Sequence, residues 1–539
     1  MIFISILIFI VAMALPSLKF NISSILLTRI TSIILFYSGV LAFNAFYIQS
    51  IGLGIGIYSG LFHVTTISQQ LDIFILLIGS LILIPRPGII EYIKTNGIKS
   101  GNIIHTEILS GLGDKYSLIV LFSTLGSTLL LSSSDLLSMY LSIELQSFGV
   151  YILATLFKES RLATSAGLKY FLLGGFSSCL ILLGSGLVYF YTGLTGLDSI
   201  YSLISSSTNE SITQGSTLGI VIIFVGFLFK VSAAPLHSWA PDVYDQSPSI
   251  ITIWLTIMPK ISIFIFLLEL YTQLESLGLS NWPVGVTVID TLNSGYVLKN
   301  ILLLSSLLSL IIGTIVGLAQ SKIKRLLAYS TISHVGFMLL AIAINTEQSI
   351  DSLLFYIIQY SLTNLDTFLI ILALGYIINS SKLINNNFIN NNKGKELDIK
   401  FISELKGQFF SNPLLSISLT ICLFSMAGIP PLLGFFSKQF VLYSAIQSGY
   451  YFMSIVCIIV SVISASYYLK IIKVLHSPST PARTPVREGQ NALAKSGPGI
   501  SNFHSFLIST LTLSILLFVL KPSIILNSTQ LLSLSLFYY

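Results

Sequence analysis

Four ionisable residues stand inside long uncharged runs of this sequence: Glu144, Lys230, Lys260 and Lys438. Lys438, for example, is the only charged residue in the run 407–468. A lysine or carboxylate in mid-membrane costs roughly 2.5–3.5 kcal/mol, so these side chains are expected to face a bundle interior and to pair. Burial favours the neutral form of a lysine, whereas a nearby carboxylate favours the charged form. The set therefore indicates a proton relay with switchable sites.

Prolines and small residues lie close to two of these lysines. The stretches "FKVSAAPLHSW" (229–239) and "FSMAGIPPLLGFFSKQF" (424–440) each interrupt an apolar segment. A proline removes a backbone donor and frees a carbonyl group, which must find water or another polar partner. The two stretches therefore predict paired broken helices, each with a hydratable point midway across the bilayer.

Three more residues are candidates for which a purely structural role stays open. His237 lies in the first interrupted stretch, and His334 lies nine residues beyond Arg325 in an apolar run. Either histidine could simply be a hydrogen-bonded core residue. Lys169 lies near the end of an expected helix, where it could reach the membrane surface or form a structural ion pair. We include all three in the candidate relay.

The composition requires lipid as the outer solvent. Of the 539 residues, 54% are hydrophobic and 9% are charged, and the mean hydropathy is +0.88. A soluble domain carries about 25% charged residues. The apolar runs do not alternate as β-barrel strands do, so we predict an all-α polytopic membrane protein. About 14 transmembrane helices are expected: 2–18, 26–48, 68–86, 115–133, 136–157, 162–192, 217–245, 248–273, 298–318, 325–345, 349–378, 410–445, 448–472 and 503–525.

Two polar stretches are expected to be solvent-exposed loops. Residues 379–406 are Asn-rich and charged, and residues 476–500 are rich in Pro, Gly and Ser. The segment 2–18 has no basic region before it, so we interpret it as the first span and not as a signal peptide. The net charge of +6 is small and scattered, which does not favour nucleic-acid binding.

The cysteines give no sign of redox chemistry. Cys179, Cys422 and Cys457 lie in apolar runs without CxxC spacing, and we expect inert core residues there, with no metal or Fe–S ligation. The sequence also has no P-loop, and no GxGxxG loop that opens a helix after a strand.

Several longer motifs resemble a known family. The run "VSAAPLHSWAPDVYDQSPSIITIWLTIMPKISI" (231–263) resembles the signature of the antiporter-like membrane subunits of respiratory complex I. The motifs "SIELQSFGVYIL", "AGLKYFLLG", "KRLLAYSTISHVGFMLL" and "AGIPPLLGFFSKQFVL" are most similar, in the same order, to chain 2 of NADH:ubiquinone oxidoreductase. The resemblance covers roughly residues 115–475. The Asn-rich insert and the Ile, Leu and Ser usage resemble a fungal, mitochondrially encoded version.

This resemblance implies an architecture. It implies two inverted five-helix repeats with broken helices, at 115–273 and 298–472, preceded by N-terminal transmembrane helices within 1–90. A C-terminal transmembrane helix is expected at 503–525. The implied location is the mitochondrial inner membrane.

The resemblance also implies roles for the candidate residues. Proton-carrying positions of the family fall on Glu144 of the fifth helix, Lys230 of the seventh, Lys260 of the eighth, Lys438 of the twelfth, His237, His334 and Lys169. The implied function is proton translocation coupled to NADH:ubiquinone electron transfer, with no redox centre in this chain. NADH, FMN, Fe–S clusters and ubiquinone are expected in partner subunits, among them neighbouring antiporter-like chains, and bound phospholipids are expected on the chain itself.

Two other interpretations remain open from the sequence alone. A stand-alone cation/proton antiporter would share the same motifs. A purely structural membrane subunit would use the buried charges only to hold its helices together.

Overall fold

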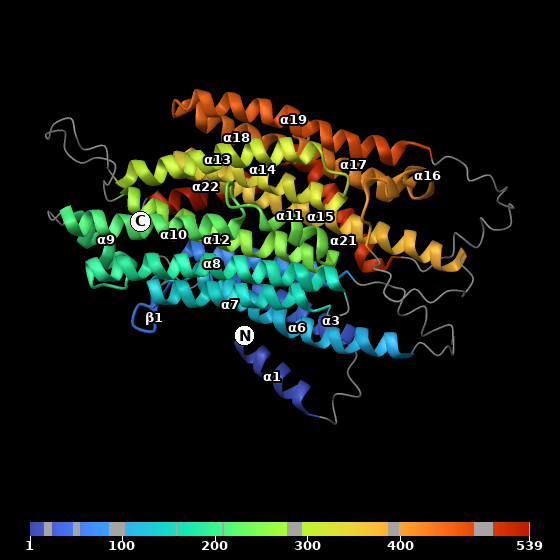
Figure 1. Cartoon of the computed structure of the whole chain (residues 1–539), viewed down its shortest axis with the longest axis horizontal. Helices are drawn as coiled ribbons and strands as arrows, with labels where there is room; N and C mark the ends of the chain where they lie inside the picture. Colours follow the sequence, from blue (N-terminus) through green and yellow to red (C-terminus); the bar gives the residue numbers. More distant parts are fainter. Residues whose placement is uncertain are drawn as a thin grey trace.

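The computed structural model is a bundle of long helices that run side by side (Figure 1). It describes residues 1–15, 24–46, 54–85, 103–157, 160–206, 210–276, 294–385, 398–478 and 500–537. Of the two predicted loops, residues 386–397 and 479–499 lie outside the described residues, whereas residues 379–385 of the first are helical.

The described elements confirm the predicted all-α class. The first half contains α1 (Ile2–Ala14), α3 (Ser24–Ala45), α4 (Thr66–Leu83), α6 (Ile103–Leu131), α7 (Leu136–Thr155), α8 (Arg161–Thr192), α9 (Leu197–Ser206), α10 (Glu210–Val231), α11 (Trp239–Gln246) and α12 (Ser249–Ser276). The second half contains α13 (Ser294–Leu318), α14 (Ile323–Ile344), α15 (Glu347–Asn385), the 3-10 helix η2 (Ile402–Leu405), α16 (Gln408–Ser411), α17 (Pro413–Ala427), α18 (Leu433–Gln447), α19 (Tyr451–His476), α21 (Asn502–Leu517), the 3-10 helix η3 (Phe518–Leu520) and α22 (Ser523–Phe537).

Each of the fourteen predicted spans corresponds to helical structure. Within the described residues, 11 helices are long and apolar enough to cross a membrane. Three more predicted spans correspond to α1, to α6, and to the broken pair α17–α18. The predicted span 217–245 is likewise broken into α10 and α11, because the chain leaves the helix between Val231 and Trp239.

Several elements were not predicted, among them α9, which lies between two predicted spans, and η2. The last expected span, 503–525, does not continue as one helix, because Pro522 follows η3 and α22 begins at Ser523. A short antiparallel hairpin joins β1 (Ile55–Ile57) to β2 (Phe62–Val64). Its turn contains Gly60 at φ +88°, a conformation that glycine adopts without steric cost.

The core of the bundle is formed by α12, α14 and α15. In the most apolar stretches of these helices, 89%, 100% and 89% of the residues are buried, respectively, against 33% in α8 and α19. Figure 1 shows α12, α14 and α15 between α8 and α19. Polar residues on the three inner helices are therefore shielded from lipid.

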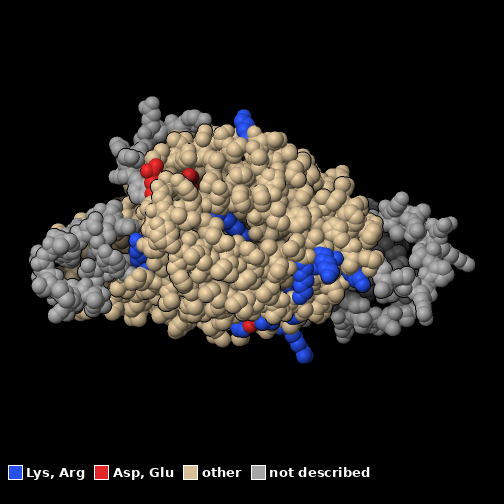
Figure 2. All heavy atoms as spheres, turned by 90° about the horizontal axis from the view of Figure 1, so that it is seen from above, with Lys and Arg blue, Asp and Glu red and all other residues tan. Residues whose placement is uncertain are grey.

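The outer surface is almost uncharged. Figure 2 shows a long face of the bundle on which lysine, arginine and carboxylate side chains appear only in a few places. Exposed large apolar side chains are frequent on the outer helices, for example Phe171 on α8 and Ile459 on α19. Such a face is suited to lipid or to another apolar protein surface.

A buried ion pair fastens a connecting segment to the core helices. Asp398 accepts hydrogen bonds from the Ser249 amide at 2.8 Å, from the Ser249 hydroxyl and from the Lys324 ammonium, which also donates to the Ser247 carbonyl at 2.9 Å. Burial alone would raise the pKa of the Asp398 carboxyl, but the charge of Lys324 and these hydrogen bonds lower it below its ordinary value. The N-terminal ends of α12 and α14 are thereby held together.

We predict that Asp398→Asn loosens this junction. Breaking a buried pair from one side costs about 3–5 kcal/mol. Hydrogen–deuterium exchange of the peptide around Ser249 should therefore accelerate at pH 7. Because the pKa of Asp398 is lowered, its contribution is present at neutral pH and disappears as the pH falls below about 4. The exposed Lys406→Gln is the control, and equal exchange in both variants at pH 7 would contradict the prediction.

Candidate functional site

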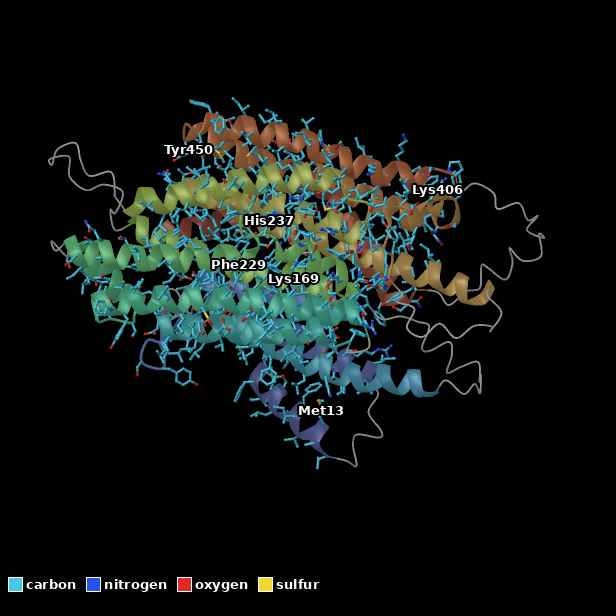
Figure 3. The ribbon with its side chains drawn as sticks, viewed as in Figure 1. Met13, Lys169, Phe229, His237, Lys406 and Tyr450 are labelled. Carbon is cyan, nitrogen blue, oxygen red and sulfur yellow. The ribbon has the colours of Figure 1, made fainter. Side chains whose placement is uncertain are left out.

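The first broken helix places Lys230 in the last turn of α10. The chain turns at Ser232, which has a φ of +66°, and α11 begins at Trp239. The Trp239 indole stacks on Tyr170 at 4.6 Å between ring centroids and donates a hydrogen bond to the Phe229 carbonyl at 3.0 Å. The same carbonyl, at the helix end, also accepts a hydrogen bond from the Ser232 amide at 3.1 Å. In Figure 3, Phe229 and His237 lie near the middle of the bundle.

Lys230 is held by one carboxylate and two hydroxyl groups. Its Nζ atom lies 3.0 Å from Glu144 Oε1, 3.0 Å from Ser178 Oγ and 3.3 Å from Ser147 Oγ. The side chains of Lys230 and Glu144 are only 6% and 12% exposed. Glu144 is fixed on α7, which Asp135 starts by accepting a hydrogen bond from the Leu137 amide at 2.7 Å. The pairing expected for mid-membrane charges is therefore confirmed for Lys230 and Glu144.

A small cavity extends from Lys230 towards α12. It offers about 20 Å³ to water and is lined by, among others, Gln146, Ser147 and Pro259. One water needs roughly 10–15 Å³ and two to four polar partners, so the cavity has room for one water. On its α12 side, the Gln146 amide donates to Ser262 Oγ at 2.8 Å. A buried polar connection therefore runs from α7 to the helix that carries Lys260.

Lys260 lies at the centre of the bundle with no carboxylate beside it. The residue is 3% exposed, and its Nζ atom has no hydrogen-bond partner among the described residues. The ammonium group instead faces two rings, those of Tyr244 and Tyr360, each at 5.7 Å from the ring centroid. Cation–π attraction is weaker than an ion pair, so Lys260 is the least stabilised cation of the set.

His334, on α14, is the next buried candidate residue beyond Lys260. Its Nδ1 atom lies 2.7 Å from the Tyr356 hydroxyl, and its Nε2 atom lies 3.4 Å from the Tyr468 hydroxyl. Its ring is 6.0 Å from that of Tyr360, which also faces Lys260. Imidazole and tyrosine hydroxyl groups can both donate and accept a proton. The cluster therefore joins Lys260 to the second half of the bundle.

The second broken helix places Lys438 opposite a helix end. α17 ends at Ala427, Gly428 takes a φ of +87°, and α18 begins at Leu433. Lys438 donates to the Met426 and Ala427 carbonyls, both at 2.9 Å. Carbonyl groups at a helix C-terminus carry partial negative charge, which stabilises a cation there. The predicted broken segment is therefore confirmed, and its free carbonyls have a partner.

Two candidates stand apart from this line. Lys169, which is 42% exposed, forms an ion pair with Asp242 on α11, and Arg325 approaches the same carboxylate at 3.5 Å. This arrangement matches the structural interpretation left open for Lys169. His237 lies in the break itself, half-buried, and its Nδ1 atom has no hydrogen-bond partner among the described residues.

The sequence reasoning missed the aromatic part of the line. Tyr356 and Tyr360 are four residues apart on α15 and so share one helix face, which is a visible signal. Tyr244 and the Gln146–Ser262 pair carry no such signal, because the residues that they contact are distant in sequence. In the described part of the chain, no group of three or more His, Cys, Asp or Glu side chains could hold a metal ion.

Comparison with known proteins identifies the family. The family model described as NADH:quinone oxidoreductase/Mrp antiporter, TM, matches residues 133–464. NADH-ubiquinone oxidoreductase chain 2 of Rhizopus oryzae is 49% identical over 559 aligned residues, which cover 100% of both chains. The chain belongs to the NADH-ubiquinone oxidoreductase chain 2 family. Glu144, Lys230, Lys260 and Lys438, to which the resemblance implies proton-carrying roles, lie on α7, α10, α12 and α18.

Two solved structures share the fold. A chain in respiratory complex I from Thermus thermophilus with bound aureothin superposes with a TM-score of 0.68 at 25% identity, covering 98% of this chain and 99% of that one. A chain in the Mrp complex from Dietzia sp. DQ12-45-1b gives a TM-score of 0.72 at 16% identity, covering 99% and 96%. At that identity the second match shows the shared fold alone.

We predict that Gly434→Ala misplaces Lys438, which lies one turn after Gly434 on α18. A Cβ atom at Gly434 would lie 1.9 Å from the Ser425 carbonyl oxygen, which is backbone and cannot rotate away. Overpacking of this kind costs about 1–3 kcal/mol or more. Proton pumping should fall, or assembly should fail. Gly175→Ala is the matched control, because nothing lies within 4 Å of its Cβ position. Equal pumping by the two variants would show that the fit of α18 against α17 is unimportant.

Proposed function

We propose that this chain is the proton-translocating subunit of the membrane arm of a respiratory complex I in the mitochondrial inner membrane. The observation that carries the proposal is the buried line of polar groups from the Glu144–Lys230 pair through Lys260 and His334 to Lys438. In this proposal the redox chemistry with NADH, FMN, Fe–S clusters and ubiquinone belongs to partner subunits. Neighbouring antiporter-like subunits and lipid cover the apolar outer faces.

The Glu144–Lys230 pair is the proposed switch. While the carboxylate lies 3.0 Å from the ammonium, it stabilises the charged lysine. If Glu144 moves away, only the hydroxyl groups of Ser147 and Ser178 remain, and a buried ammonium is then poorly stabilised. Lys230 would release its proton into the adjacent cavity. Reduction of quinone in a partner subunit would drive this movement through a conformational or electrostatic change.

The released proton would travel along the polar groups already described. Water in the cavity and the Gln146–Ser262 contact lead towards α12, the helix that also carries Lys260. The weak stabilisation of Lys260 by rings suits a site that holds a proton only briefly. Hydroxyl reorientation at Tyr356 and Tyr468 around His334 then leads towards Lys438. There the helix-end carbonyls hold the charged form.

The energies are adequate for this task. Moving one proton against 100 mV requires about 2.3 kcal/mol. A hundredfold change in the proton affinity of one lysine corresponds to about 2.7 kcal/mol. The free-energy change from switching one ion pair is therefore sufficient to move one proton against a potential of 100 mV.

The other two interpretations are disfavoured by different observations. The 49% identity to a chain 2 protein over the whole chain favours a complex I subunit over a stand-alone antiporter. A purely structural role for the charges would be served by close ion pairs throughout, whereas Lys260 has no carboxylate partner among the described residues.

The decisive experiment is the double variant Glu144→Gln with Lys230→Met. Removing either partner alone leaves an unpaired buried charge and costs about 3–5 kcal/mol. Removing both should restore assembly, because no orphan charge remains, but should leave proton pumping strongly reduced. The measurement is NADH-driven proton uptake by the assembled complex in sealed vesicles. Pumping close to the wild-type level would refute the role of this pair.

Substitutions at Lys438 should separate charge from proton exchange. Lys438→Arg keeps a cation against the Met426 and Ala427 carbonyls, so the complex should assemble. Arginine holds its proton at any physiological pH, so pumping should fall at least fivefold. Lys438→Met should lower pumping as well, together with quinone reduction, since the two are coupled. Normal pumping with arginine would exclude deprotonation at this position.

A further inference from the structure

A second cluster of buried titratable groups lies outside this line, where α15, α17 and α21 pack together. Cys422 Sγ donates to Asp366 Oδ2 at 3.1 Å, and His504 Nε2 lies 3.1 Å from the Leu369 carbonyl oxygen, one turn beyond Asp366 on α15. Asp366, Cys422 and His504 are each 0% exposed. We refer to these three residues as the Asp366 cluster.

The position of the cluster follows from contacts on two helices. Ser437, next to Lys438, donates to Gln359 Oε1 at 3.4 Å, and Asp366 is seven residues further along α15, which is about 10 Å of helix. On α17, Cys422 lies five residues before Ala427, or about 7.5 Å. The two estimates place the cluster about one and a half to two turns from Lys438, towards the end of the bundle where α16 lies (Figure 1).

Two atoms of the cluster are unsatisfied. Asp366 Oδ1 and His504 Nδ1 are buried, and neither has a hydrogen-bond partner among the described residues. Buried polar atoms without partners are rare and costly in native proteins. An acidic oxygen and an imidazole nitrogen that both lack a partner are suited to bind water and to exchange protons with it.

We propose that Asp366 is a proton-carrying residue that connects Lys438 with the α16 end of the bundle, with Cys422 positioning its carboxyl group and His504 forming the next step. This inference rests on the proposed proton-translocating function. An isolated buried carboxylate is costly, so Asp366 rests as a neutral acid. When it has lost its proton towards His504, the Lys438 ammonium transfers one to it through intervening water. An ammonium and a carboxylate thereby become an amine and an acid, and only N–H and O–H bonds change.

The test is Asp366→Asn in the assembled complex, reconstituted in liposomes with NADH and a short-chain ubiquinone. Asparagine keeps the size of the side chain and an acceptor for Cys422 but cannot carry a proton. Pumping should fall at least fivefold, and Asp366→Glu should recover at least half of the wild-type rate. A merely structural role predicts normal pumping with asparagine, and that result would overturn the proposal. Ser361→Ala is the control on the same helix, because its hydroxyl bonds only its own backbone, at Ile358.

If the complex with Asp366→Asn does not assemble, His504→Gln is a second, independent test of the proposal. Glutamine can still donate to the Leu369 carbonyl but does not titrate, so pumping should fall while assembly persists; unchanged pumping would refute the proposed step. Lys438→Met, measured in parallel, separates this inference from the proposed function. Normal pumping in both Lys438→Met and Asp366→Asn would refute the whole relay, whereas loss in Lys438→Met alone would refute only the role of Asp366.

Discussion

The burial of ammonium groups within a lipid-spanning bundle is the constraint on which this structure depends. Each lysine needs a polar partner, which apolar side chains cannot supply. The partners differ between the two lysines that lie beside helix breaks. Beside the first break, Lys230 meets the Glu144 carboxylate and two serine hydroxyls. At the second break, Lys438 meets the free carbonyls that end α17. A continuous helix would have kept those carbonyls in its own hydrogen bonds.

These solutions give the two halves different properties. A carboxylate on a separate helix can approach or withdraw, so Lys230 has a partner whose influence can change. The carbonyls beside Lys438 belong to the backbone of an adjoining helix, so its stabilisation changes only if α17 and α18 move relative to each other. Lys260 lies between two tyrosine rings and has neither a carboxylate nor a helix-end carbonyl as its partner among the described residues. In the relay that we propose, Lys230 is a switchable site, Lys260 a transient site and Lys438 a fixed site.

Much of this arrangement could be predicted from single segments of sequence. The buried charges, the two breaks and the contact of Glu144 with Lys230 follow from the cost of a charge in lipid and from the chemistry of proline.

Contacts between distant segments could not be predicted in that way. Cys422 and Cys457 are buried as expected, whereas Cys179 is exposed. The hydrogen bond from Cys422 to Asp366, 56 residues away, has no signal in the sequence. Lys169 shares the apolar helix α8 with Ser178, but its position near the helix start pairs it with Asp242 instead. The hairpin at 55–64 depends on a glycine turn, and its strands of three residues each are too short to show an alternating pattern.

A relay of this kind also needs a frame that keeps its distances constant while single side chains move. The contact between α8 and α10 supplies part of that frame, since a Cβ atom at Gly184 would lie 2.6 Å from the Gly219 carbonyl oxygen. Such close backbone approach leaves no room for the helices to slide. Many serine hydroxyls on the spans bond to their own helix, as Ser361 does to the Ile358 carbonyl at 2.8 Å, so they add polarity without requiring a partner helix. Rigid helices with a few polar side chains between them confine the movement to the groups that exchange the proton.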